Sequence, residues 1–93
     1  MKKEFPITLS QLKTIYDVDW DLFVEEIVPN CFCSNCPGVV SIVNYSIVVN
    51  DLNDIILMGH CSVCGDRVNR YIETGEHEYY VRRIKKVKKE MKK

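Results

Sequence analysis

Two short cysteine clusters decide the fold of this chain: Cys31-Phe32-Cys33-Ser34-Asn35-Cys36 and Cys61-Ser62-Val63-Cys64-Gly65. Each contains a Cys-x2-Cys pair, and residues 37–60 separate the two pairs. Two intervening residues let the backbone fold into a tight turn, or knuckle, so that both sulfurs reach one ion at about 2.3 Å. Two such pairs predict a tetrahedral zinc site whose ligands are Cys33, Cys36, Cys61 and Cys64.

Other uses of the cysteines fit the sequence less well. A disulfide framework is disfavoured by the odd number of cysteines, five, and by the lack of an apolar secretory segment behind the charged start of the chain. A thioredoxin-like motif needs one pair at the start of a helix, and neither pair opens one. Iron in a rubredoxin-like site uses the same ligands as zinc and stays the alternative metal. We expect one structural zinc ion and a cytoplasmic protein.

Three further residues belong to metal-binding types. Cys31 is expected to be a small buried hydrophobe beside the site, and the alternative is that it replaces Cys33 as a ligand. His60 adjoins Cys61, but strand alternation before the knuckle turns its side chain elsewhere. His77 lies in a charged stretch and is expected to face solvent.

The first third of the chain is predicted to be a pair of helices. Thr8 and Gln11 have the spacing of a capping box, and Leu9, Leu12 and Tyr16 follow on one helical face. A second helix, capped by Asp19 and ended by Pro29, is predicted from an apolar stripe: Trp20, Phe23, Val24, Ile27 and Val28. A DNA-binding helix-turn-helix is rejected, because the second helix carries Asp21, Glu25 and Glu26, which phosphates would repel.

The middle of the chain is predicted to form a small antiparallel sheet. Residues 39–43 and 45–49 are rich in β-branched side chains, and residues 50–54 are a turn cluster. Residues 55–58 are apolar at consecutive positions, which predicts a central strand covered on both faces. Residues 67–73 return along it.

Arg70 is the one charged residue expected among apolar neighbours, since it alternates with Val68 and Ile72 on one face of its strand. Two interpretations stay open. The side chain reaches out to solvent from an edge position, or it pairs with Asp51 or Asp54 or approaches the thiolates.

Residues 31–75 resemble a four-cysteine zinc ribbon, with Cys33, Cys36, Cys61 and Cys64 on the ligand positions of that family. Residues 50–59, which lead into Cys-x2-Cys-Gly, are also similar to small, uncharacterised prokaryotic zinc-ribbon proteins. The resemblance covers about half the chain and implies a stand-alone ribbon without an assigned activity. One departure is Pro37-Gly38 behind the first pair, which indicates an irregular first knuckle.

The expected fold class is therefore α+β, in a single domain over residues 1–93. It comprises a helical pair (1–29), a three-stranded zinc-ribbon sheet (30–75) and a basic helical tail (76–93). Four cysteines leave no open coordination position, so the metal is expected to be structural and the protein not an enzyme. Chelation is expected to unfold residues 31–75.

The charges are divided unequally along the chain. Thirteen basic and thirteen acidic residues give a formal net charge of zero, yet residues 81–93 carry +7 and residues 1–80 carry −7. The tail is predicted to be a helix with a narrow apolar stripe, and it places like charges four residues apart, which destabilises an isolated helix. The apolar stripe consists of Tyr80, Ile84, Val87 and Met91.

Such a helix needs something negative nearby, and three partners are considered. They are the acidic body of the protein itself, above all Asp21, Glu25 and Glu26; nucleic-acid phosphates; and an acidic protein or anionic membrane surface. No apolar run is long enough to span a membrane. The leading interpretation is a non-enzymatic zinc-binding module that contacts nucleic acid through its tail, and the alternative is a protein–protein adaptor or regulatory subunit. The candidate contacts to nucleic acid or another anion are Arg82, Arg83, Lys85, Lys86, Lys88 and Lys89.

Overall fold

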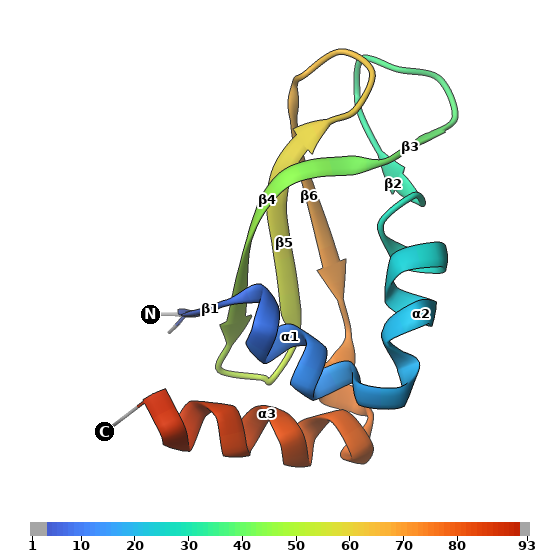
Figure 1. Ribbon diagram of the computed structural model, residues 1–93. Coiled ribbons are helices and arrows are strands. Elements are labelled where there is room, and N and C mark those ends of the chain that lie inside the picture. Colours follow the sequence, from blue (N-terminus) through green and yellow to red (C-terminus); the bar gives the residue numbers. More distant parts are fainter. Residues whose placement is uncertain (1–3, 92–93) are drawn as a thin grey trace.

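The computed structural model describes the backbone of residues 4–91 and the side chains of residues 4–90. Figure 1 shows a sheet that runs between two ends, with the cysteine-bearing loops at one end and the C-terminal helix across the other. The elements in chain order are β1 (Glu4–Ile7), α1 (Leu9–Tyr16), η1 (Asp17–Asp19), α2 (Trp20–Leu22), η2 (Phe23–Ile27), β2 (Cys31–Phe32), β3 (Val39–Val40), β4 (Ile42–Asn50), β5 (Ile55–Cys61), β6 (Arg67–Ile72), η3 (Thr74–Glu76) and α3 (Glu78–Met91).

The mixed α and β composition and the antiparallel pairing agree with the expected fold class, but the sheet is larger than expected. It has four strands in the order β1-β4-β5-β6, and β2 and β3 form a separate two-stranded sheet. Strand β1 was missed because Pro6 interrupts its apolar pattern. Proline lacks the N–H that a ladder needs and is confined to edge strands, and β1 is an edge strand that pairs with residues 47–50 of β4.

Strand β4 joins the last two residues of the predicted stretch 39–43 to the whole of the predicted stretch 45–49, while Val39–Val40 form β3. Its register against β5 shifts between Val43 and Ser46, and Asn44 at this irregularity has a φ of 50°. Gly59 of β5 lies against the same place, where an added Cβ would approach the Val43 carbonyl oxygen to 2.7 Å. The close approach of the two backbones therefore requires glycine here.

The predicted capping box at the start of α1 is present. The Gln11 N–H donates to Thr8 Oγ1 at 3.1 Å, and the Thr8 N–H donates to Gln11 Oε1 at 2.8 Å. The buried face of α1 differs by one residue from the expected one, because Ile15 is buried and Leu9 is 48% exposed. Leu9 occupies the first helical turn, beyond the edge of the core.

The predicted second helix is only partly α-helical. After α2 the chain continues as a five-residue π-helix, η2, in which the Val28 N–H donates to the Phe23 carbonyl at 3.1 Å. The wider turn breaks the expected apolar stripe, so that Phe23 is fully buried while Val24 is 47% exposed. Asp19 makes no capping bond and accepts a hydrogen bond from the Tyr80 hydroxyl instead, at 3.1 Å.

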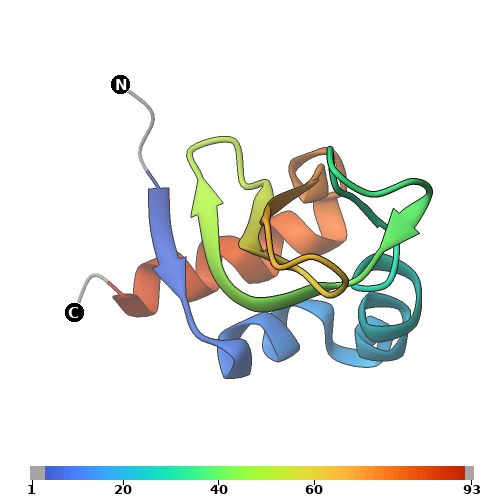
Figure 2. The ribbon, with the colours of Figure 1, turned by 90° about the horizontal axis from the view of Figure 1, so that it is seen from above.

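One hydrophobic core joins the sheet to the helices. Leu57 on β5, Leu12 on α1 and Ile84 on α3 belong to the same cluster of buried side chains as Cys33 and Cys61. The helices α1 and α2 lie along one side of the sheet, and α3 runs across its end (Figures 1 and 2). Strand β5 is an interior strand, as predicted, but its two faces are covered unequally: the buried side chains alternate with half-buried ones such as those at positions 56 and 58.

Candidate metal centre

The structure brings the four predicted cysteines together at one end of the sheet (Figure 1). All four sulfur atoms lie within 4.8 Å of one another, with 3.5 Å between the sulfurs of Cys33 and Cys64 and 3.8 Å between those of Cys36 and Cys61. A tetrahedron of metal–sulfur bonds about 2.3 Å long separates its sulfurs by about 3.8 Å. The cluster therefore has the size of a tetrahedral metal site.

The first knuckle follows β2 and leads back into β3. The Cys36 N–H donates to the Cys33 carbonyl at 3.2 Å, which closes the turn between the two ligands. Pro37 then precedes Gly38, whose φ of 72° is cheap for glycine alone. The glycine with positive φ is thus separated from the second cysteine of the pair by one residue, Pro37, whereas in the second knuckle it follows the cysteine directly. This extra residue is the irregularity that Pro37-Gly38 indicated.

The second knuckle joins β5 to β6 and is more compact. Gly65 directly follows Cys64, has a φ of 82°, and donates its N–H to the Cys61 carbonyl at 3.0 Å. The Val63 N–H points at the Cys61 sulfur, 3.3 Å away. Gly65 therefore has the role in this turn that its position after the second pair predicted.

The electrostatics of the four sulfurs call for a cation. Hydrogen bonds from the backbone N–H groups of Cys64 and Val63 lower the pKa of the Cys61 thiol to about 7, against the opposing effect of burial. The sulfur of Cys64 beside it and burial raise the pKa of the Cys36 thiol to about 12. Neighbouring sulfurs resist joint ionisation, so the four thiolates need a positive ion among them.

Short contacts between their flanking chains hold the two knuckles side by side. The Ser62 N–H donates to the Ser41 carbonyl at 3.0 Å, and the Ser41 N–H donates to Ser62 Oγ at 3.3 Å. Ile42 is the register partner of Cys61, and its N–H donates to the Val28 carbonyl at 3.1 Å. The first knuckle is thus tied both to the second knuckle and to the end of the helical segment.

The fifth cysteine lies apart from the cluster. Cys31 is 1% exposed, and its thiol donates to the carbonyls of Ile27 and Val28 at 3.6 Å. His60 is exposed on β5, and neither it nor Cys31 is among the residues whose ligand atoms gather at the site. His77 is also exposed, and its ring meets that of Tyr80 edge to face at 5.9 Å.

The basic tail lies at the opposite end of the sheet, where two of its cations turn inward. Arg83 donates to the Ile15 carbonyl and to Asp17, both at 3.3 Å. Lys88 donates to the Asn50 carbonyl at 2.8 Å and to Asn53 Oδ1 at 2.7 Å. Together with buried Ile84 and Val87, these contacts fasten α3 to α1 and to the β4–β5 turn. The side chain of Met91 and residues 92–93 lie outside the described part.

The acidic surface proposed for the tail is not where α3 lies. Asp21, Glu25 and Glu26 are exposed on the α2–η2 segment, and none of them forms an ion pair with another residue of the 4–91 segment. The acids that meet the helix are Asp17, which pairs with Arg83, and Asp19, which accepts a hydrogen bond from the Tyr80 hydroxyl. These contacts arise because the helix docks by its apolar side, and α1 ends beside it.

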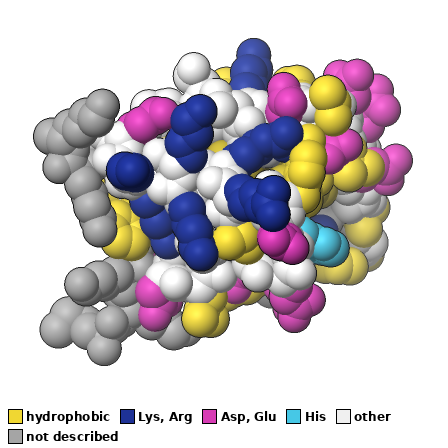
Figure 3. Space-filling view, turned by 90° about the horizontal axis from the view of Figure 1, so that it is seen from below, with side chains coloured by type: hydrophobic (Ala, Val, Ile, Leu, Met, Phe, Trp, Pro, Cys, Tyr) yellow, Lys and Arg dark blue, Asp and Glu magenta, His cyan; other side chains and the backbone are white. Residues whose placement is uncertain are grey.

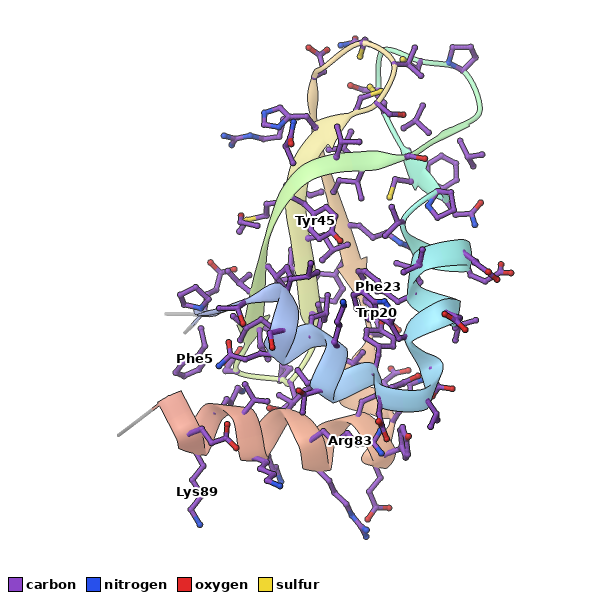
Figure 4. The ribbon with its side chains drawn as sticks, viewed as in Figure 1. Phe5, Trp20, Phe23, Tyr45, Arg83 and Lys89 are labelled. Carbon is purple, nitrogen blue, oxygen red and sulfur yellow. The ribbon has the colours of Figure 1, made fainter. Side chains whose placement is uncertain are left out.

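The remaining cations of α3 face away from the body. We call them the basic face: Arg82, Lys85, Lys86 and Lys89. Viewed from below, lysine and arginine side chains gather over this helix (Figure 3), and Lys89 points away from the protein (Figure 4). Arg82 pairs with Glu78 at 2.9 Å, whereas the three lysines pair with no described acid.

Arg70 makes neither of its two proposed ion pairs. Its strand places it opposite Leu57, whose side chain is fully buried, and its Nε atom is buried without a hydrogen-bond partner among the described residues. The positive charge counteracts the rise in pKa of Cys31 and of Tyr16 that burial causes. Arg70 is thus half-buried on the edge strand β6, near Cys31 and Tyr16.

The structure adds a polar network that the sequence did not single out, in which the buried Asn50 and Asp54 meet the exposed Tyr71. The Tyr71 hydroxyl donates to Asp54 Oδ2 at 2.7 Å and accepts from Asn50 Nδ2 at 2.9 Å. Asp54 Oδ1 accepts from the Gly75 N–H at 2.8 Å. The turn composition of residues 50–54 signalled the reversal, but its partners on β6 and η3 are distant in sequence.

No helix within residues 4–91 is both long and apolar enough to cross a lipid bilayer. No family model, curated protein or solved structure matches this chain. The likeness to zinc ribbons therefore depends on the cysteine spacing and on the geometry of the two knuckles.

Proposed function

We propose that the protein is a non-enzymatic zinc-binding module of the ribbon type that presents the basic face of α3 to nucleic acid. The observation that supports this most is the division of α3 into two sides. Its inner side is fastened by Ile84, Val87, Arg83 and Lys88, while the cations of the basic face extend into solvent. Three of these cations, Lys85, Lys86 and Lys89, form no ion pair with a described acid, and unpaired cations on a rigid helix attract phosphate.

The metal has a structural role in this proposal. Four thiolates complete a tetrahedral shell, whereas catalytic zinc keeps a position for water. The ion would join residues 31–40 to residues 61–67 and so brace the end of the sheet remote from α3. Zinc is preferred to iron because the proposed role requires no electron transfer, and reduced thiolates agree with a cytoplasmic setting.

Salt dependence of binding tests the proposal. The metal-loaded chain should bind mixed-sequence nucleic acid at low salt. If all four residues of the basic face contact phosphates of a single strand, the slope of log K against log salt should be about −3. Replacing Lys86 and Lys89 by glutamine should make this slope shallower by about 1.4.

A matched control variant has the same net charge as the Lys86 and Lys89 double variant but leaves α3 unchanged. Lys13 and Arg67 lie outside α3, and their replacement by glutamine removes the same two charges. This control should bind like the natural chain. Equal weakening in both double variants would show that only net charge matters, and no binding at low salt in the natural chain would refute the proposal.

A second candidate is a protein adaptor, and one observation favours it. Phe32 and Val39 are partners across the β2–β3 pair and are 75% and 56% exposed, while Val63 in the second knuckle is 74% exposed. Exposed apolar side chains at one end of a small protein are typical of protein contacts. Binding to a protein partner that survives the Lys86 and Lys89 changes but is lost on Phe32→Ser and Val63→Ser would support this candidate.

A further inference from the structure

We infer that the nucleic acid is single-stranded, and that Tyr79 stacks on one of its bases at the start of the basic face. This inference rests on the proposed function and names the ligand class of the same site. Four exposed residues of α3 lie on the same side of the helix. Tyr79, Arg82, Lys86 and Lys89 are three or four residues apart, so they form one line along the outer side of α3.

The Tyr79 ring is held in place although it lies at the surface. The Arg83 guanidinium lies over the ring, 3.8 Å from its centroid, and Arg83 is itself bonded to Asp17 and to the Ile15 carbonyl. The ring of Tyr80 meets that of Tyr79 at 5.3 Å and 76°. Residue Tyr79 is nevertheless 43% exposed, so an aromatic surface is both oriented and accessible.

A shallow hollow beside this ring gives a base room to lie. It has a volume of about 450 Å³ and is lined by Glu78, Tyr79, Arg82 and Arg83. This size lies within the range of small-ligand sites. Bases stack on tyrosine rings and on guanidinium planes alike, and the hollow offers both. The ion pair between Arg82 and Glu78 is largely exposed and therefore weak, so Arg82 can turn to a phosphate.

The pattern favours a single strand over a duplex. Bases in a duplex are stacked on each other and present only their edges, whereas the unstacked bases of a single strand can lie flat on an aromatic ring. The line from Tyr79 to Lys89 is about 15 Å long, because each helical residue rises about 1.5 Å. At the duplex spacing of 3.4 Å per nucleotide of one strand that length corresponds to about four nucleotides, and to fewer in a strand that is extended because its bases are unstacked.

The test measures fluorescence anisotropy of the metal-loaded full chain with labelled oligo(dT) and with a labelled DNA duplex of equal charge. The natural chain should prefer oligo(dT). Tyr79→Leu should weaken oligo(dT) binding about 5- to 150-fold, the range for loss of one base–aromatic stack, and should leave duplex binding unchanged. Tyr79→Trp should retain the preference, because it keeps an aromatic ring. Phe32→Leu, at the other end of the protein, is the matched control and should change neither affinity.

Each other outcome has a definite meaning. Equal affinity for both probes, unchanged by Tyr79→Leu, would overturn the stacking inference and leave the proposed function standing. No binding to either probe at low salt would overturn both. Equal binding of poly-glutamate, with the same dependence on the basic face, would overturn the inference in favour of an acidic protein partner.

Discussion

The turns at the two ends of the sheet are held by different interactions. At the cysteine end, β5 passes into β6 through a knuckle whose sulfurs gather with those of the first knuckle, and the flanking residues Phe32 and Val63 are exposed. At the α3 end, β4 passes into β5 through a turn whose polar groups are paired within the protein. There Asp54 is 7% exposed and Tyr71, Gly75 and Lys88 supply donors to the turn.

This difference indicates how stability is divided along the sheet. At the cysteine end Phe32, Val39 and Val63 are exposed and four sulfurs lie together, so we expect the order of this end to depend on a cation that offsets the charge of the thiolates. The α3 end has Ile55, Ile84 and Val87 in the core, and the polar groups of its turn are paired by hydrogen bonds such as that between Tyr71 and Asp54. We therefore expect the α3 end to keep its structure under conditions that disorder the cysteine end.

Metal removal should have the largest effect on stability, and it tests directly whether the cysteine end and the α3 end differ in stability. Structural zinc contributes about 10–16 kcal/mol of apparent binding energy in small zinc peptides, more than the cysteine end can replace. Chelation should expose the amides of residues 31–41 and 60–67 to hydrogen exchange while those of residues 48–57 stay protected. The sequence alone led to the expectation that residues 31–75 unfold together, whereas the structure limits the unfolding to the cysteine end. Uniform loss of protection over the sheet would show that residues 31–75 do unfold together.

Cysteine substitutions supply the control for metal removal. Cys36→Ser should abolish stable metal binding, because it removes a ligand from a complete shell. Cys31→Ala changes a buried cysteine outside the cluster and should leave one metal ion per chain, measured by elemental analysis. Loss of metal in the Cys31 variant would make Cys31 a ligand and contradict the geometry of the cluster.

Asp54→Ala should have the next largest effect and acts on the α3 end alone. It removes the acceptor of the Tyr71 hydroxyl and the Gly75 N–H, and hydrogen bonds to a charged group contribute about 1.5–3 kcal/mol each. We expect a loss of about 3 kcal/mol in the free energy of unfolding, measured by urea denaturation. Asp51→Ala, in the same turn but exposed, should cost less than about 0.5 kcal/mol.

Lys88→Met should have a smaller effect, because it keeps most of the apolar stem and removes the two hydrogen bonds to Asn50 and Asn53. A loss of about 1–2 kcal/mol is expected. The adjacent Lys89→Met should leave the unfolding free energy nearly unchanged, since Lys89 is exposed. Equal effects of the two changes would show that α3 is not fastened through Lys88.

Arg70 lies between the two ends of the sheet, and Arg70→Leu should have the smallest effect on the free energy of unfolding. The residue is half-buried and its Nε has no hydrogen-bond partner among the described residues, so an apolar side chain removes an unpaired buried polar group at little cost. We expect a change between zero and about 1 kcal/mol in favour of the folded state, with exposed Arg67→Leu in the same strand as control. A large loss of stability would mean that Arg70 has an anionic partner.

The features that were predictable depend on residues near one another in the chain. Thr8 and Gln11 form a capping box because the bond spans three residues, and Gly65 takes a positive φ because it closes a turn that begins at Cys61. By contrast, the exposure of Val24 was not predictable. It follows from a π-turn, and local apolar periodicity does not distinguish such a turn from an α-helical one.

The sequence by itself determined the cluster of four cysteines and the two-sided character of α3. Both are local patterns: ligand pairs two residues apart, and apolar side chains at the period of a helix. Tertiary structure alone decided that β1 adds an edge to the sheet, that Asp54 meets Tyr71, and that α3 docks beside Asp17. These contacts join distant parts of the chain, and they form only where burial of the shared core brings those parts together.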